Sequence, residues 1–139
     1  MKSVEQLLEQ NGFYAAAIHG ISMLPLLTDH RDIAFIEPSD TIRRFDVVLF
    51  RRDNGQLVLH RVLQCDATSA IFAVAGDNDS TVERVRRDQI LGVMTSFCRD
   101  GKTVRADSPL HRWYARFWNA TPLTRSWLQR LFRRLRRRR

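Results

Sequence analysis

Short apolar segments bounded by turn-forming residues recur along the first 107 residues, and they constrain the fold more than any other feature. Asp53-Asn54-Gly55 and Asp100-Gly101 are typical of tight hairpin turns, because these residue types tolerate positive φ angles. The sequence has no strand–helix–strand alternation, the pattern that would indicate a parallel sheet. The pattern predicts a mainly β (α+β) fold, a small antiparallel, partly closed sheet with strands at 13–18, 32–37, 46–51, 56–64, 70–75, 90–97 and 103–106.

A short helix is predicted ahead of the sheet, over residues 4–10. Ser3 and Gln6 have the spacing of a capping box, in which each side chain accepts a backbone N–H of the first turn, and Gly12 is a stop signal. Among the predicted strands, the run Val47-Val48-Leu49-Phe50 is apolar at every position rather than at alternate ones. Such a run is typical of a strand that is buried on both faces, so this segment is predicted to be central in the sheet.

The positive charge of the chain is concentrated at its C-terminal end. The 139 residues carry a net charge of +8, yet all 15 acidic residues lie at or before Asp107, and ten arginines follow Ser108. Without those ten arginines, the other 13 Lys and Arg face 15 acids, a net charge of −2. The sequence therefore predicts a near-neutral domain, residues 1–107, followed by a basic tail, residues 108–139.

Two helix starts are predicted in the tail, each a hydroxyl residue followed by proline, at Ser108-Pro109 and Thr121-Pro122. The second helix would carry an apolar stripe beside its arginines: Trp127, Leu128, Leu131, Phe132 and Leu135. A basic amphipathic helix suits an anionic membrane surface, which we favour as a partner over nucleic acid because the stripe is continuous. The alternative is that residues 110–118 pack on the domain and only the final arginines are solvated.

The sequence predicts neither a membrane-spanning helix nor a signal peptide. Residues 1–10 include Glu5 and Glu9 and lack an apolar run. The 19 residues from Gln10 to Thr28 carry no formal charge, but amide side chains, glycines and Pro25 interrupt them. The expected location is therefore cytoplasmic or peripheral at a membrane. The 2 cysteines are too few for a disulfide framework, and no residue spacing indicates a metal or cofactor site.

Three separated residues have the chemistry of a serine nucleophile, its base and an orienting acid. Ser22 lies in Gly20-Ile21-Ser22-Met23-Leu24-Pro25, where glycine permits an unusual backbone angle before the serine and proline fixes φ after it. His60 falls on the predicted strand 56–64, and Gly76-Asp77-Asn78 follows the strand 70–75. Each residue alone is common in a turn or a core, and their joint order is what indicates a catalytic site.

Residues 20–97 resemble the catalytic region of type I signal peptidases and of the serine peptidase group that they share with the self-cleaving SOS repressors. The Ser-Met-x-Pro box is present as Ser22-Met23-Leu24-Pro25, and the Gly-Asp-Asn box as Gly76-Asp77-Asn78. The base box reads His60-Arg61-Val62, similar to the histidine-base type of archaea and the endoplasmic reticulum. The family's Gly-Asp box matches Arg31-Asp32 and Phe45-Asp46 in the aspartates but not in the glycines.

The resemblance implies a serine endopeptidase that cleaves a precursor or a signal- or leader-type peptide, with Ser22 as nucleophile and His60 as general base. Two acids stay open as the group that orients His60: Asp77, and Glu83 at the position of the family's second carboxylate. His19, close to Ser22 in sequence, is a candidate for lining the substrate cleft. The alternative function is a catalytically inactive peptide-binding or membrane-docking module of the same fold, against which the presence of both Ser22 and His60 argues.

Overall fold

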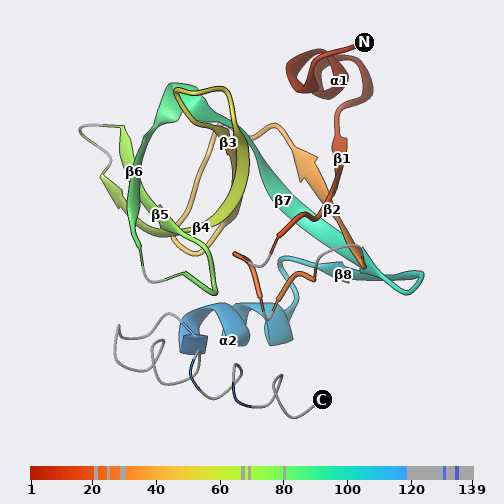
Figure 1. Ribbon diagram of the computed structural model, residues 1–139, viewed down its shortest axis with the longest axis vertical. Helices are drawn as coiled ribbons and strands as arrows, with labels where there is room; N and C mark the ends of the chain where they lie inside the picture. Colours follow the sequence, from red (N-terminus) through yellow and green to blue (C-terminus); the bar gives the residue numbers. More distant parts are fainter. Residues whose placement is uncertain are drawn as a thin grey trace.

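Strands dominate the structure, a computed structural model that describes residues 1–20, 22–24, 26–28, 31–66, 68, 70–79, 81–118, 130 and 134 (Figure 1). The two α-helices with assigned bounds are α1 (Val4–Asn11) and α2 (Pro109–Trp118). The strands are β1 (Tyr14–Ala17), β2 (Asp32–Glu37), β3 (Val47–Arg51), β4 (Leu57–Asp66), β5 (Ile71–Ala75), β6 (Glu83–Arg86), β7 (Ile90–Arg99) and β8 (Lys102–Arg105). A short 3₁₀ turn, Arg87–Gln89, precedes β7.

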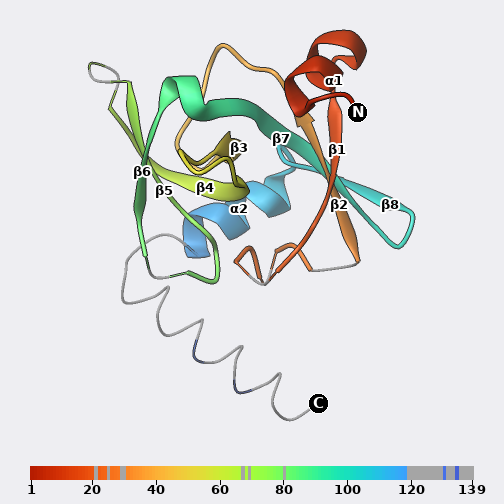
Figure 2. The same cartoon turned by 45° about the horizontal axis from the view of Figure 1, so that its top comes forward.

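All eight strands join one antiparallel sheet in the order β1-β2-β7-β3-β4-β5-β6, with β8 paired to β7. The long strand β7 is shared, because its residues 93–99 pair with β2 and its residues 90–93 with β3. From β3 the sheet curls through β4, β5 and β6 into a half-barrel (Figures 1 and 2). The prediction of a mainly β, antiparallel and partly closed sheet is confirmed.

Strand β3 separates two hydrophobic clusters, and its alternating side chains enter both. Val47 and Leu49 pack in a cluster with α1, the loop after β1, β2 and β7. Val48 and Phe50 pack in a second cluster, inside the curl formed by β4, β5, β6 and the start of β7. The prediction of a central strand that is buried on both faces is confirmed. His60 of β4 packs against Phe50, in the cluster inside the curl.

Helix α1 begins and ends as its sequence predicts. Ser3 Oγ accepts the Gln6 N–H at 3.2 Å, and the Gln6 side chain accepts the Ser3 N–H at 2.9 Å. Gly12 closes the helix in the left-handed conformation, at φ 77°. Strand β6, in contrast, is not predicted, because three of its four residues are charged and only Val85 is buried in the curl.

Helix α2 lies against one end of the curled sheet (Figures 1 and 2). Its predicted start is confirmed, since Ser108 Oγ accepts the His111 N–H at 3.3 Å. His111 and Trp118 are among its buried side chains, so the first part of the predicted tail packs on the domain. Of the helix predicted after Thr121, the structure describes only Arg130 and Arg134, both helical, and the rest lies outside the described residues. Among the helices that the structure describes, none combines the length and the apolar character needed to span a membrane.

Candidate active site

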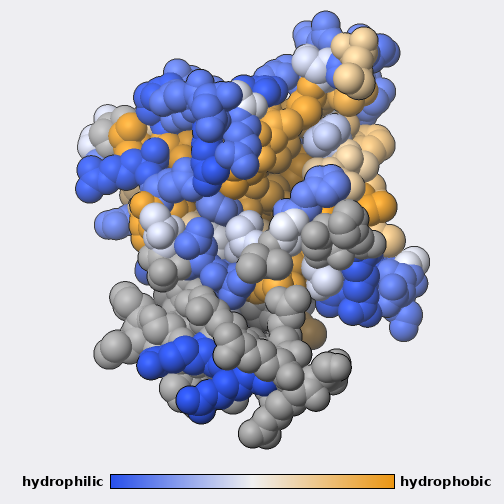
Figure 3. All heavy atoms as spheres, viewed as in Figure 1, coloured by the Kyte–Doolittle hydropathy of each residue, from blue (hydrophilic) through white to orange (hydrophobic). Residues whose placement is uncertain are grey.

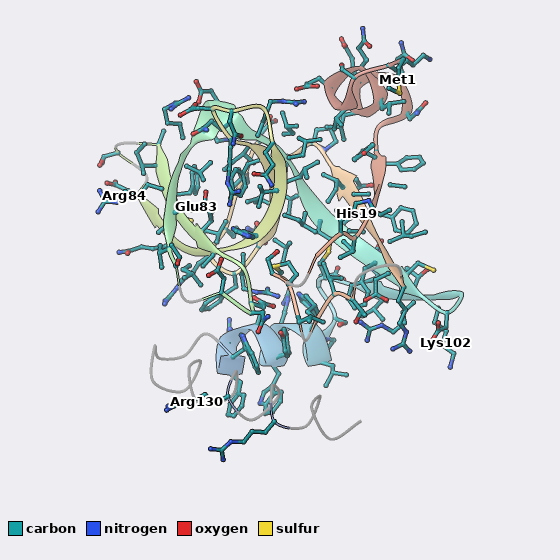
Figure 4. All side chains as sticks on the ribbon, viewed as in Figure 1. Met1, His19, Glu83, Arg84, Lys102 and Arg130 are labelled. Carbon is teal, nitrogen blue, oxygen red and sulfur yellow. The ribbon has the colours of Figure 1, made fainter. Side chains whose placement is uncertain are left out.

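The four predicted catalytic residues lie on four separate segments. Ser22 is in the turn that follows β1, and His60 is within β4. Asp77 follows β5, and Glu83 is the first residue of β6 (Figure 4). Ser22 and His60 line the same cleft, which has a volume of about 510 Å³. The fold therefore places the predicted nucleophile and the predicted base in the lining of one cleft, with no hydrogen bond between them among the described residues.

One wall of this cleft is β1 and the two residues after it, and the facing wall is the start of β4, residues 57–60. In Figure 3, hydrophobic side chains line a hollow between the curled part of the sheet and the α1 side of the molecule. His19 lines the cleft, in agreement with its prediction. Strand β1 is an edge strand, because β2 is its only partner among the described strands. Its second edge is therefore open to an added strand.

The turn that carries Ser22 is held against the Gly76-Asp77-Asn78 segment. The Asn78 N–H donates to the Ser22 carbonyl oxygen at 2.8 Å. A Cβ added to Gly76 would lie 3.0 Å from Ser22 Cβ and still nearer to the Ser22 carbonyl oxygen. Met23, the next residue, is 3% exposed and anchors the turn in the core. The Ser-Met-x-Pro and Gly-Asp-Asn boxes, which are remote in the sequence, thus pack against each other. Glycine is required at position 76 because a side chain there would overlap the Ser22 turn.

His60 is buried, and one of its ring nitrogens faces an acid. The side chain lies opposite Val48 in the β3–β4 register and packs against Phe50, with 5.8 Å between ring centroids. Its Nδ1 lies 3.8 Å from Glu83 Oε1 and has no hydrogen-bond partner among the described residues. Burial lowers the pKa of His60, and the Glu83 carboxylate opposes this shift without cancelling it. The imidazole is therefore neutral at pH 7, as a general base must be.

Glu83 is held by an arginine that the sequence analysis did not single out. Arg52, in the hairpin between β3 and β4, donates Nε to Glu83 Oε2 at 3.1 Å and Nη2 to Oε1. Asp79 also lines the cleft and is, after Glu83, the next carboxylate that raises the pKa of His60. In the sequence, Arg52 and Asp79 are marked as site residues only by their proximity to motifs: Arg52 precedes the Asp-Asn-Gly turn, and Asp79 follows the Gly-Asp-Asn box.

Asp77 has different partners. Its Oδ1 accepts from Arg61 Nε at 2.8 Å and its Oδ2 from Arg61 Nη2 at 3.0 Å, and both side chains are fully buried. From α2, Tyr114 donates its hydroxyl to the same Oδ2 at 2.9 Å, and Trp118 Nε1 donates to the Asp77 carbonyl oxygen at 2.7 Å. Of the two acids left open by the sequence, Glu83 has the carboxylate beside His60 Nδ1, while Asp77 fastens β4 to α2.

The backbone at Phe45 has a conformation that is uncommon for a residue with a side chain. Phe45 has φ 73°, in the left-handed region that favours glycine. The Phe45 N–H donates to the Val62 carbonyl oxygen and the Val62 N–H to that of Asp46, each at 2.7 Å. These two bonds hold the segment that leads into β3 against β4.

Comparison with known proteins assigns no family. Family models, curated proteins and solved structures were compared with the chain, and none of them matches. Within the part of the chain that the structure describes, no group of three or more His, Cys, Asp or Glu side chains is arranged to hold a metal ion. A functional assignment must therefore be argued from the side chains of the cleft.

Proposed function

We propose that the chain is a serine endopeptidase that cleaves a precursor or leader-type peptide by acyl transfer. The observation that carries this proposal is the presence of Ser22, from the turn after β1, and His60, from β4, in one cleft. A hydroxyl and a neutral imidazole within one cleft are the core of a nucleophilic site. The volume of about 510 Å³ is ordinary for a site that encloses several side chains of a ligand.

In this mechanism, neutral His60 takes the hydroxyl proton of Ser22 as Oγ attacks the peptide carbonyl carbon, and the imidazolium then returns the proton to the leaving amine. Water hydrolyses the acyl-enzyme by the same route. Because Nδ1 faces Glu83, the base is Nε2. The Glu83 carboxylate stabilises the imidazolium, and Arg52 holds that carboxylate in place. The Ser22 backbone N–H is the first donor to the oxyanion.

An extended peptide is the substrate form that the cleft favours. Strand β1 lines the cleft and has one edge that pairs with no described strand, to which a peptide can add as a further strand through main-chain hydrogen bonds. The side chains of Ala15, Ala16 and Ala17 are small and leave room for those of the peptide. Since β1 leads directly to the Ser22 turn, a peptide paired with it is carried toward the nucleophile. Only an unfolded segment, such as a leader, can enter in this way.

Ser22→Ala is expected to reduce hydrolysis of an extended-peptide library by at least about 10³-fold, because both steps of acyl transfer need the hydroxyl. It should also abolish covalent labelling by an alkyl fluorophosphonate, and mass spectrometry of the wild-type chain should place the label on Ser22. Ser96→Ala, which removes a hydroxyl from β7 outside the cleft, is the matched control and should keep both activities. A wild-type chain that binds peptides without cleaving them or reacting would instead be an inactive binding module.

Glu83→Gln is expected to move the acid limb of the kcat/KM profile to lower pH. The active form of His60 is neutral, so activity is lost as pH falls through its pKa, which burial places below the ordinary value of 6.5. Removing the Glu83 carboxylate, which raises that pKa, lowers it further, and the released Arg52 acts in the same direction. The plateau rate should fall as well, because the imidazolium loses its partner. Glu9→Gln on exposed α1 should change neither quantity, and an acid limb that moves upward would contradict this assignment of Glu83.

A further inference from the structure

A second cleft, of about 440 Å³, lies between α2 and the sheet. Its walls are the segment that leads into β3, the middle of β7, the connection from β8 to α2, and α2 itself. The described residues that line it include none of those that line the Ser22 cleft. What sets this cleft apart is its arginines: Arg43, Arg44, Arg105, Arg112 and Arg116. Its ligand is therefore to be sought independently of any peptidase activity.

The charge of this cleft is only partly compensated. Arg105 Nε pairs with Asp107 Oδ1 at 3.1 Å, and Asp46 is the other acid in the lining. The side chains of Arg112 and Arg116, which α2 presents to the cleft, have no ion pair with any described carboxylate. Five guanidinium groups thus face two carboxylates, which leaves a surplus of three positive charges around one hollow. Such a surplus attracts a multiply charged anion.

A buried imidazole without a partner lies in the same lining. His111 is 7% exposed, and its Nδ1 has no hydrogen bond within the described structure. Burial and the nearby Arg61 lower the pKa of His111 to about 4, against a smaller opposing effect of Asp77. A buried polar atom left without a partner costs free energy, and buried polar groups almost always have one. The imidazole in the wall of the cleft is therefore placed to respond to an anion bound there.

We propose that this cleft binds a phosphate group, held by the guanidinium groups of Arg112 and Arg116, beside the imidazole of His111. Guanidinium forks match the spacing of phosphate oxygens, and each bond is charge-assisted. A carboxylate carries one negative charge and would leave most of the positive surplus unpaired, whereas a phosphate monoester carries nearly two at pH 7. The number of cations around the hollow is what favours phosphate.

The phosphate group can come from a small phosphorylated molecule or from a lipid whose headgroup ends in a phosphate monoester, such as phosphatidic acid. The outer face of α2 exposes Leu110, Trp113 and Phe117, of which Leu110 is 77% exposed, and Trp113 and Phe117 stack at 5.1 Å. Apolar side chains next to arginines are the arrangement with which an interfacial helix meets anionic lipid. Both sources present a phosphate monoester to Arg112 and Arg116, beside His111, so one set of variants tests both.

The decisive measurement is a titration of the full chain with inorganic phosphate at pH 7.5, following the His111 imidazole resonances by NMR. Bound phosphate should shift these resonances and raise the pKa of His111, because the anion favours the imidazolium. Arg112→Gln and Arg116→Gln should each weaken the phosphate affinity by at least about tenfold. Arg84→Gln on β6, which removes the same charge away from the cleft, is the matched control and should keep the affinity (Figure 4).

The second arm is co-sedimentation with phosphatidylcholine vesicles that contain phosphatidic acid, whose headgroup is a phosphate monoester, or phosphatidylserine as the anionic control without one. Binding that prefers phosphatidic acid and is weakened by Arg112→Gln and Trp113→Ala, but not by Arg84→Gln, assigns the phosphate to a lipid headgroup. A His111 response to inorganic phosphate without such vesicle binding assigns it to a small molecule. Unchanged His111 resonances in the phosphate titration together with no such vesicle binding, or equal weakening by Arg84→Gln and Arg112→Gln, would overturn the proposal, because the arginines would then bind no phosphate at this site or bind anions by charge alone.

Discussion

Asp77→Asn is expected to lower the free energy of unfolding by about 3–5 kcal/mol, because it leaves Arg61 as a buried charge without a counter-ion. Both side chains of the pair are 0% exposed, and the two bonds between them are 2.8 and 3.0 Å long. Burial alone would lower the pKa of Arg61, but the adjacent carboxylate outweighs it and raises that pKa, so the guanidinium stays charged. Urea unfolding followed by far-UV circular dichroism measures the loss.

Two comparisons separate this buried pair from an ordinary ion pair. Asp100→Asn removes the partner of Arg31 in a pair whose side chains are 66% and 51% exposed, and it should cost far less. Replacing both buried partners, as Arg61→Met with Asp77→Leu, should give a chain more stable than Asp77→Asn alone, since no unpaired charge remains. If Asp77→Asn and Asp100→Asn destabilise the chain equally, the fold does not depend on the buried pair.

The same variant also distinguishes the two acids near the cleft. Asp77 receives hydrogen bonds from Arg61 and Tyr114, whereas Glu83 has an oxygen 3.8 Å from His60 Nδ1. Folded Asp77→Asn should therefore move the acid limb of the wild-type profile less than Glu83→Gln does, because Asp77 has a smaller effect than Glu83 on the pKa of His60, and Glu83→Gln should keep most of the stability. The acid that pairs with Arg61 and the acid that the proposed mechanism assigns to His60 thus come from the two ends of the connection between β5 and β6.

Local signals in the sequence were sufficient to predict most of the sheet. Hairpin turns such as Asp100-Gly101 are encoded by residues that accept positive φ, and both of these have it, at 51° and 77°. The apolar run in β3 predicted a strand buried on both faces. Strand β6 gave no such signal, since Glu83-Arg84-Val85-Arg86 owes its conformation to pairing with β5 rather than to its own composition. Such an edge strand is specified by its neighbour.

The candidate site could be predicted only to the level of its motifs. Ser22 and His60 follow from short boxes, but the choice between Asp77 and Glu83 depends on strand register, which no local pattern encodes. Register places Arg61 opposite Ala75, two residues before Asp77, and Glu83 opposite Val74. The acid within the Gly-Asp-Asn motif, Asp77, thereby pairs with Arg61, and the acid farther along the chain, Glu83, lies beside His60. The contacts of Arg52 with Glu83 and of Tyr114 on α2 with Asp77 also join residues that are remote in the sequence.

Gly76→Ala is expected to displace the Ser22 turn while leaving the domain folded. The backbone of Gly76 does not have a positive φ, so alanine is allowed by conformation, but its Cβ would overlap the Ser22 carbonyl oxygen. The Ser22 turn must move, and the bond from the Asn78 N–H to that oxygen must lengthen from 2.8 Å. Because a shift of about 1 Å at a reacting group costs about 10²-fold in rate, labelling of Ser22 by a fluorophosphonate should slow by that factor or more.

Gly12→Ala provides the control for Gly76→Ala, because at Gly12 the backbone angle disfavours alanine while the space around an added Cβ is free. Gly12 has φ 77° and nothing within 4 Å of an added Cβ, so alanine there strains the backbone by about 1 kcal/mol but displaces no neighbour. It should lower stability and leave Ser22 labelling unchanged, whereas Gly76→Ala should slow labelling and speed amide exchange at Asn78. Amide exchange tests the packing even if the chain is no peptidase. Unchanged exchange at Asn78 would contradict the close contact itself, and faster exchange with unchanged labelling would mean that the contact does not position the nucleophile.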